Sequence, residues 1–457
     1  MSADQHPDPR ASGLAGRLTA VARNPAVRGI AGVFVLKSSI IVANFTLIML
    51  AARVLDTDAF GVFSILFAAA GLFCIVATFG QQVSLMRWWN EYSAANDVPT
   101  LKGVLVFSAA TVAAGCAIVG SGFFLWAAST HALLLASAVT LYMAMQAAVA
   151  TSAHLVRTAV GVGAGDGVGN LMVSVPAVLY LAAILVAGAS AEVSTVFFLF
   201  AAGAGVAVCL HVLFMRRRIG ALYPGFASVR PRFLPREWRA RSFKLWISNG
   251  LEAANQYLDV LIIGYLMSPA VAGAYFVTTR LANIFATASD TMHMFSTRHI
   301  PDLYYRGEMK QLNALLNSVA AITLAVVVAG MVVMLAGGKL FLMVFNEAYV
   351  PYYPALALLS VGTAAMAAAG PSGSILMLTG HEGRYLRIIA LTVLLRAAGF
   401  FVLVPAFGIM GAVSATTISF VFMTAMLRHA CKRLTGLDGS VLRLAGRRGQ
   451  TEVPPAE

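Results

Sequence analysis

The sequence has little charge and little cysteine. Only 11% of its 457 residues are Asp, Glu, Lys or Arg, whereas 59% are hydrophobic, and the mean hydropathy is +0.81. A soluble globular domain carries about 25% charged residues, so this composition excludes a water-soluble fold. The four cysteines fall in apolar runs or beside basic segments, and their spacing offers neither a disulfide framework nor a metal site.

Nucleotide-binding motifs are also absent. The sequence contains no Gly-x4-Gly-Lys-Ser/Thr phosphate-binding loop, and the run Gly161–Gly167 does not place glycine at all three positions of the dinucleotide motif. The net charge of +13 is accompanied by neither a zinc-finger spacing nor a basic stripe with interleaved aromatic residues. We therefore expect no cofactor, no bound metal and no nucleic-acid partner.

What the sequence does contain is a series of long apolar runs. A helix needs about 20 residues to cross the roughly 30 Å hydrocarbon core of a bilayer. Twelve runs are long enough, at 29–52, 60–84, 101–127, 132–156, 168–188, 193–215, 243–267, 271–297, 312–336, 354–379, 387–405 and 408–429. The sequence therefore predicts an all-α, polytopic membrane protein of about 12 transmembrane helices.

Basic residues alternate along the connections between these runs. Of the 32 Lys and Arg residues, 27 lie in every second connection, and the intervening connections hold only Arg53 and Lys339. Cytoplasmic loops retain Lys and Arg because transfer of these residues across the bilayer is opposed. Both termini are therefore predicted to be cytoplasmic, and the turns near Asp56, Glu192 and Glu347 are predicted to lie on the opposite side.

A basic, proline-containing segment separates two halves of six runs each. We expect a cytoplasmic tail at 1–28, an N-terminal lobe at 29–215, a basic cytoplasmic linker at 216–242, a C-terminal lobe at 243–430 and a disordered cytoplasmic tail at 431–457. The linker has two interpretations. It is a signal that fixes the topology, or it is a segment that docks to anionic lipid or to an anionic lipid-linked substrate before entry.

The two halves resemble each other at the turn that follows the first span of each. Leu55–Phe63 and Leu266–Tyr275 both run from a leucine through a glycine to an aromatic residue, and Gly273 follows Gly61 by 212 residues. Asp56, in the first of these turns, is predicted to cap the next helix. Parallel repeats of this kind in transporters enclose a central cavity, so we expect one between the halves.

Short motifs are spread in a fixed order over nearly the whole chain. They are Ala52–Leu55, Phe60–Gly61, Phe79–Gly80 and Arg87 in the first half, and Asp259, Gly273–Tyr275, Pro301 and Pro405–Ala412 in the second. Their order resembles that of the Wzx-like polysaccharide transporters in the multidrug/oligosaccharidyl-lipid/polysaccharide (MOP) flippase superfamily. Two positions depart from the family's pattern, since Asp56 replaces a glycine and Arg396 replaces a neutral asparagine.

The resemblance implies both a fold and a function. The fold would be MATE-like, with two six-helix lobes around a central cavity. The function would be that of a flippase, not an enzyme, that carries a polyprenyl-diphosphate-linked oligosaccharide across the bacterial inner membrane by alternating access, coupled to H⁺ or Na⁺. The cargo would be an O-antigen or exopolysaccharide repeat unit on an undecaprenyl-type lipid. Membrane lipids and polysaccharide-assembly proteins would be further partners.

Independently of the resemblance, polar residues follow a helical period in the predicted seventh and eighth spans. They are Asn249, Glu252, Gln256 and Asp259 in the seventh, and Arg280, Asn283, Thr287 and Asp290 in the eighth. At about 100° per residue, each set lies on one face of its helix. Lys37 and Asn44 form a shorter stripe in the first span, and Arg396 places a charge in the eleventh.

Charged residues at this depth must be compensated. Each costs about 2.5 to 3.5 kcal/mol at mid-bilayer even on the lenient insertion scale. Six charges facing lipid would cost on the order of 15 to 20 kcal/mol, more than the stability of a typical domain. Two alternatives remain: neutralised structural pairs or a hydrated transport cavity. For Arg280 the choice lies between a substrate contact and a pair with Glu252, Asp259 or Asp290.

The transport hypothesis gives each of these residues a role. Lys37, Arg280 and Arg396 are candidates for holding the diphosphate, because a guanidinium or ammonium group matches its charge. The amide side chains expected to line the substrate cavity are Asn44, Asn249, Asn255, Gln256 and Asn283. The acids that could bind a coupling ion, as the resemblance implies, are Glu252, Asp259 and Asp290.

Two other classes of protein compete with the flippase. One is a cation-coupled small-molecule or multidrug antiporter, of the same superfamily or of the major facilitator type. The loop 87–102 lacks the Gly-x3-Asp-Arg-x-Gly-Arg-like run of the latter. The other is a membrane enzyme, which needs a sizeable outer catalytic loop. The longest outer connection, at 337–353, offers only Lys339 and Glu347.

Overall fold

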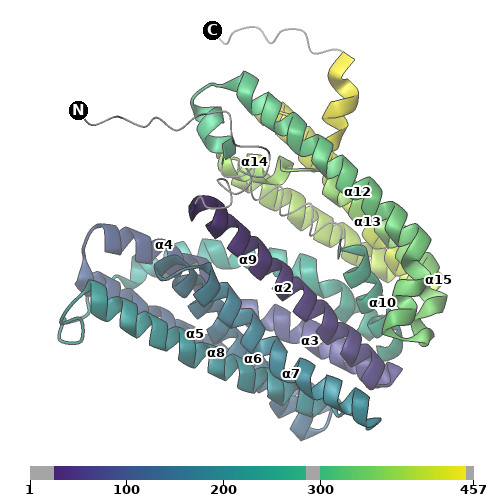
Figure 1. The fold of residues 1–457 in the computed structure, drawn as a ribbon, viewed down its shortest axis with the longest axis horizontal. Coiled ribbons are helices and arrows are strands. Elements are labelled where there is room, and N and C mark those ends of the chain that lie inside the picture. Colours follow the sequence, from purple (N-terminus) through teal and green to yellow (C-terminus); the bar gives the residue numbers. More distant parts are fainter. Residues whose placement is uncertain (1–24, 285–298, 449–457) are drawn as a thin grey trace, which may run out of the picture.

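The computed structural model describes residues 25–284 and 299–448, and all regular elements in these ranges are helical (Figure 1). The first half contains α2 (Pro25–Val54), α3 (Thr57–Ala77), α4 (Gln81–Ala94), α5 (Val98–Thr130), α6 (Leu133–Ala159), η1 (Gly163–Gly167), α7 (Val168–Ala187) and α8 (Val193–Leu222). The second half contains α9 (Pro235–Leu266), α10 (Pro269–Ala282), α12 (Met309–Phe345), η2 (Glu347–Tyr352), α13 (Tyr353–Ala368), α14 (Ser372–Leu378), α15 (Glu382–Thr435) and η3 (Val441–Arg448).

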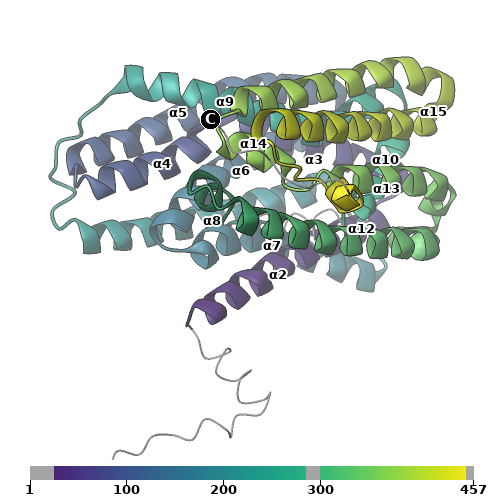
Figure 2. The same cartoon turned by 90° about the horizontal axis from the view of Figure 1, so that it is seen from above.

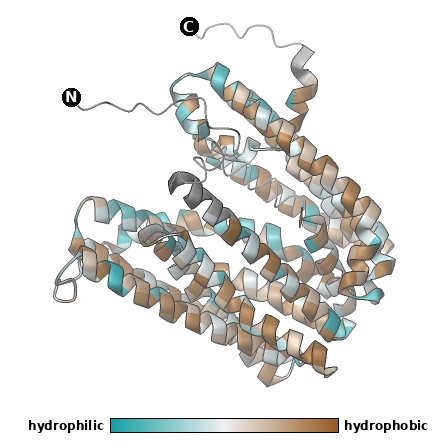
Figure 3. Cartoon of the chain, viewed as in Figure 1, coloured by the Kyte–Doolittle hydropathy of each residue, from teal (hydrophilic) through white to brown (hydrophobic). Residues whose placement is uncertain are grey.

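The predicted all-α membrane fold is confirmed. Within the described ranges, nine helical segments are long and apolar enough to cross a membrane, and Figure 3 shows hydrophobic residues along their length. The 54-residue α15 holds the last two predicted spans, because Gly408, with φ of 56°, interrupts its helical backbone. Helix α9 corresponds to the seventh predicted span and is less apolar because it carries the polar stripe. Helix α10 begins the eighth.

The second helix of each half starts with a side-chain cap. Asp56 Oδ1 accepts a hydrogen bond from the Ala59 N–H over 2.7 Å at the start of α3, which confirms the predicted cap. Ser268 Oγ accepts from the Val271 N–H over 3.4 Å at the start of α10. Each cap satisfies a backbone donor that has no partner within its own helix. The sequence repeat is therefore a structural repeat at these two turns.

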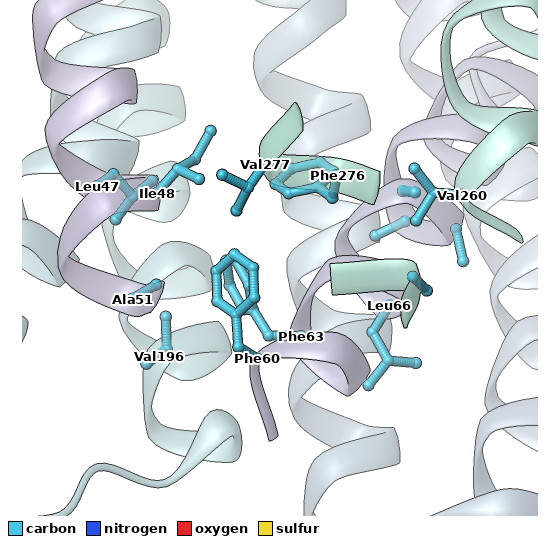
Figure 4. Packing of buried hydrophobic residues seen from close by; sticks show 14 of the residues in the cluster. Leu47, Ile48, Ala51, Phe60, Phe63, Leu66, Val196, Val260, Phe276 and Val277 are labelled. Carbon is cyan, nitrogen blue, oxygen red and sulfur yellow. The ribbon is translucent and has the colours of Figure 1, made fainter. Parts of the chain in front are cut away.

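The two equivalent turns pack directly against each other. A Cβ atom added to Gly61 would lie 1.9 Å from the Pro269 carbonyl oxygen, and one added to Gly273 would lie 3.1 Å from the Gly61 Cα atom. Only glycine permits this approach, so the backbones of α3 and α10 meet here. The fully buried rings of Phe60 and Phe276 extend the contact (Figure 4). This packing closes one end of the space between the halves.

The other end of the molecule is splayed. In Figure 1 the bundle containing α4 to α8 and the bundle containing α12 to α15 converge toward the end where α3 and α10 lie and diverge toward the loop 223–234. We call the side that carries this loop the basic side, because Arg230 and Arg232 lie in the loop and Lys432 and Arg433 lie in the last turn of α15 on the same side. Figure 2 shows that α2 begins away from the other helices on this side.

The helices extend further than the apolar runs. Helix α8 continues to Leu222 and α9 starts at Pro235, so that only 223–234 is non-helical within the predicted linker. In the tail that was predicted to be disordered, 431–435 form the end of α15 and 441–448 form the helix η3, which packs against α12. The charged residues of these segments end the apolar runs but do not interrupt the helices, because their side chains leave the backbone hydrogen bonds intact.

Candidate functional site

Two cavities lie next to each other between the halves. One has a volume of about 290 Å³ and is lined by residues of α3, α9, α10, α13 and α15. The other has a volume of about 390 Å³ and is lined mainly by α2, α3, α6 and α7, with α9 and α10 closing it. We call them the C-cavity and the N-cavity. Three residues line both: Gln256, Tyr257 and Arg280. The polar faces of α9 and α10 therefore form the partition between the cavities.

Arg280 lies in the last turn of α10, and its side chain is shared by the two cavities. Its guanidinium carbon lies 4.8 Å from the centroid of the Phe276 ring, one turn earlier in the same helix. Among the described residues, no carboxylate lies within 4.0 Å of its nitrogens. An aromatic face attracts a cation without neutralising its charge. Arg280 therefore presents a whole positive charge to the cavities.

Arg396, by contrast, is neutralised inside the C-terminal half. Its Nε lies 2.9 Å from Asp259 Oδ1, and the Arg396 side chain is only 1% exposed. Its Nη2 donates to the carbonyl oxygen and to Oδ1 of Asn255, each over 2.8 Å. Its Nη1 is buried and has no hydrogen-bond partner among the described residues.

The Asp259 carboxylate is satisfied on its second oxygen as well. The Tyr275 hydroxyl donates to Asp259 Oδ2 over 3.1 Å and lies 2.9 Å from Thr416 Oγ1. Tyr275 belongs to the repeat motif that follows Gly273, and it is fully buried. A buried charge is tolerated when it is paired and its lone pairs are hydrogen-bonded. This network ties α9, α10 and the two arms of α15 together.

Lys37 is neutralised in the N-terminal half by an acid that the sequence analysis did not single out. Lys37 Nζ lies 3.0 Å from Asp166 Oδ2, and Arg157 Nη1 lies 3.4 Å from Asp166 Oδ1. Asp166 is in η1, a single π-helical turn that precedes α7. A Cβ added to Gly165 would lie 2.5 Å from the Ala153 carbonyl oxygen, so the glycines let this turn pack closely against α6.

The run Gly161–Gly167 therefore has a structural role that a search for nucleotide motifs overlooked. One signal was available in the sequence. Asp166 is an isolated acid at the edge of an apolar run, opposite the predicted inner half of the span that contains Lys37. Because each base embedded in the membrane needs a compensating acid, a search for acids near the span of Lys37 would have identified Asp166 as its counter-ion.

The predicted site residues divide into three groups. Those that line the C-cavity are Asn255, Gln256, Asp259, Arg280, Asn283 and Arg396. Asn44 lines the N-cavity, where its Oδ1 accepts a hydrogen bond from Ser174 over 3.0 Å. Those that line neither cavity are Lys37, Asn249 and Glu252. Asp290 and Thr287 lie outside the described residues. Of the polar stripe of α9, Gln256 and Asp259 thus line a cavity, whereas Asn249 and Glu252 do not.

The charge of the lining follows from these contacts. The Asp259 carboxylate offsets Arg396, and no other acid among residues 25–284 and 299–448 lines either cavity, so Arg280 gives this described lining one net positive charge. Aromatic rings and amides complete the lining, with Tyr142 and Phe200 in the N-cavity and Phe420 in the C-cavity. The described residues contain no group of three His, Cys, Asp or Glu side chains suited to a metal ion.

No protein-family model and no curated protein matches the chain. Solved structures do match. An inward-facing multidrug resistance MATE family transporter of the MOP superfamily superposes with a TM-score of 0.68 at 11% identity, covering 88% of this chain and 98% of that one. An outward-facing structure of such a transporter gives a TM-score of 0.52 at 12% identity, covering 88% and 94%.

A third similar structure is a MOP superfamily transporter from Pyrococcus furiosus, for which a binding pocket of reverse polarity suggests a different function. Its TM-score is 0.50 at 12% identity, and the match covers 87% of this chain and 94% of that one. Identities this low establish the architecture alone. The chain accordingly has the fold of the MOP-superfamily transporters, as the sequence predicts.

Proposed function

We propose that this protein is a flippase that moves a polyprenyl-diphosphate-linked oligosaccharide across the bacterial inner membrane. The observation that carries the proposal is the position of Arg280, whose charge is shared by both cavities and is paired with no described acid. A half-buried cation without a counter-ion favours binding of an anionic partner. A diphosphate supplies one, because its oxygens accept the parallel donors of a guanidinium fork.

The rest of the lining suits the remainder of such a substrate. Amide groups of Asn44, Asn255 and Gln256 offer donors and acceptors for sugar hydroxyls. Aromatic rings such as Tyr257 suit the apolar faces of sugar rings. The substrate would lie across the partition formed by α9 and α10, with its diphosphate at Arg280.

Alternating access would use the contact between the two halves. We propose that the basic side faces the cytoplasm, since Lys and Arg accumulate in cytoplasmic loops. The splayed form of the molecule would then be open to the cytoplasm, which agrees with the higher TM-score against an inward-facing transporter. Reaching the outward-open form would separate Gly61 from Gly273 and bring the basic-side ends of the bundles together.

The acids proposed for ion coupling differ in whether a basic residue already neutralises them. Asp259 already has a fixed cation in Arg396, so binding H⁺ or Na⁺ there would require breaking that pair. Glu252 is exposed on α9 and has no basic partner among the described residues. We therefore propose Glu252 as the more accessible coupling acid, alongside Asp290, which lies outside the described residues.

The proposal is tested by deleting the gene in its own bacterium. The expected result is loss of a surface polysaccharide together with accumulation of polyprenyl-linked oligosaccharide inside the cell, both reversed by the intact gene. Unchanged surface polysaccharide with altered sensitivity to small toxic molecules would instead support the alternative function, a cation-coupled multidrug antiporter. The MATE fold favours that alternative, whereas the net positive lining disfavours the cationic substrates that such a pump would bind.

A further inference from the structure

A groove at the basic-side end of α15 changes from apolar to cationic along its length. Its volume is about 560 Å³, and it lies between α15, Ala365 of α13 and Leu442 of η3. The α15 wall begins at Val421, which is 49% exposed, and ends at Lys432 and Arg433. At about 1.5 Å per residue, Val421 and Lys432 are about 16 Å apart along the helix axis. The groove thus joins the membrane-facing surface of α15 to its basic end.

The cations at this end are not neutralised. Lys432 and Arg433 are exposed, and neither side chain has an ion pair or hydrogen bond among the described residues. His429 lies beside them, and the part of the chain that the structure describes places no acidic residue on the groove. Arg428, one turn earlier, is different, because its Nε and Nη2 each lie 3.0 Å from Asp438 Oδ2. At least two positive charges therefore face the groove without a counter-ion.

The second wall is built by the chain after α15. Ser440 donates from its N–H and its hydroxyl to Asp438 Oδ1, over 3.0 and 2.6 Å. Arg443 donates to the Asp438 carbonyl over 2.9 Å and to Asn313 Oδ1 of α12 over 2.8 Å. Burial raises the pKa of Asp438, but the Ser440 hydrogen bonds and the Arg428 charge bring it below its usual value. An ionised Asp438 thus fixes η3, and with it Leu442, opposite α15.

We propose that this groove binds one anionic phospholipid from the leaflet on the basic side. Its phosphate would lie at Lys432 and Arg433, and an acyl chain would follow Ala425 and Val421 toward the bilayer centre. A phospholipid presents a negative headgroup and an apolar chain in the same order as the groove presents its partners. A soluble anion would use only the cationic end. Basic pockets at the ends of transmembrane helices attract anionic headgroups for the same reason. This inference goes beyond the transport of any substrate.

The test is lipid binding to the purified full-length protein, measured by native mass spectrometry. The probes are phosphatidylglycerol and, as the neutral reference, phosphatidylcholine with the same acyl chains. The test variant is Lys432→Gln with Arg433→Gln, which leaves the Arg428 pair intact. The matched control is Arg216→Gln with Arg217→Gln, which removes the same charge from exposed positions at the basic-side end of α8.

The protein should retain one phosphatidylglycerol in preference to phosphatidylcholine. The test variant should lose about thirtyfold in affinity, since each basic residue near an anionic headgroup contributes about 1 kcal/mol and 1.4 kcal/mol is tenfold. The control variant should bind as the unmodified protein does. Equal losses in both variants, or no preference for the anionic lipid, would overturn the proposal. Displacement of the lipid by millimolar glycerol phosphate would overturn it too, because the groove would then recognise a headgroup alone.

Discussion

Arg396 and Asp259 form an ion pair inside the C-terminal half, with 2.9 Å between Arg396 Nε and Asp259 Oδ1. The two residues lie on α15 and α9, and both line the C-cavity. At the position of Arg396, the resemblance to polysaccharide transporters leads one to expect a neutral asparagine. The structure supplies a reason for the charge, because the guanidinium is the counter-ion of a buried carboxylate. Of the two embedded basic residues that have an acid partner, Arg396 is far more buried than Lys37, with 1% of its side chain exposed against 46%.

The first prediction concerns this pair. Arg396→Gln and Asp259→Asn should each leave a buried charge unpaired, at a cost of about 3 to 5 kcal/mol. The double variant should recover most of that stability, because two amides replace the two charges and can hydrogen-bond to each other. Protein abundance in the membrane and the melting temperature in detergent measure both effects. If the double variant is no more stable than the less stable single variant, the loss of stability in the single variants does not come from breaking the Arg396–Asp259 pair.

The second prediction concerns Arg280. Arg280→Ala should abolish transport while membrane levels stay normal, because no described carboxylate is left without a partner. Arg280→Lys should restore transport only in part, since the planar fork is lost. Complementation of the deletion strain, with protein abundance measured in parallel, tests both variants.

Lys339→Ala is the matched control for Arg280→Ala. Lys339 also lies over an aromatic ring, 5.5 Å from the Tyr353 centroid, but it lines neither cavity. The Lys339→Ala variant should therefore transport normally. If Arg280→Ala reduces abundance as strongly as it reduces transport, Arg280 has a structural role and the substrate contact is contradicted.

The third prediction concerns the contact between the halves. Gly61→Ala places a methyl group where the Pro269 carbonyl oxygen lies, so the two turns must separate. Overpacking of this kind costs about 1 to 3 kcal/mol, and it should disfavour the splayed form and lower the melting temperature. Gly122→Ala is the control, because nothing lies within 4 Å of its added Cβ. Equal melting temperatures for the two variants would contradict the close approach of α3 and α10.

The fourth prediction concerns orientation. In a cysteine-free background, Arg236→Cys should resist an impermeant thiol reagent in intact spheroplasts, and Glu347→Cys should react. The reason is that basic connections remain in the cytoplasm. Permeabilised cells, in which both positions should react, serve as the control. Labelling of Arg236→Cys alone in intact spheroplasts would show that the orientation is the reverse of the predicted one.

Hydrophobicity and periodicity determined the architecture from sequence alone. Apolar runs of about 20 residues can span a bilayer as helices, because a helix pairs its backbone N–H and C=O groups within the segment. The all-α fold follows from these runs. Local chemistry was equally readable. The cap at Asp56 depends on residues within one turn, and the helical period of the polar stripe brings Gln256 and Asp259 to the C-cavity.

The tertiary structure alone decided which charges neutralise each other. Lys37 and Asp166 are 129 residues apart in sequence, and their contact depends on how α2 packs against η1 and α7. The same holds for Arg396 and Asp259, which come from different helices. A sequence shows how many charges must be compensated, because each is costly in a bilayer, but pairing is a matter of distances between helices. Only once those pairs were known did Arg280 stand apart as the embedded cation that no described acid neutralises.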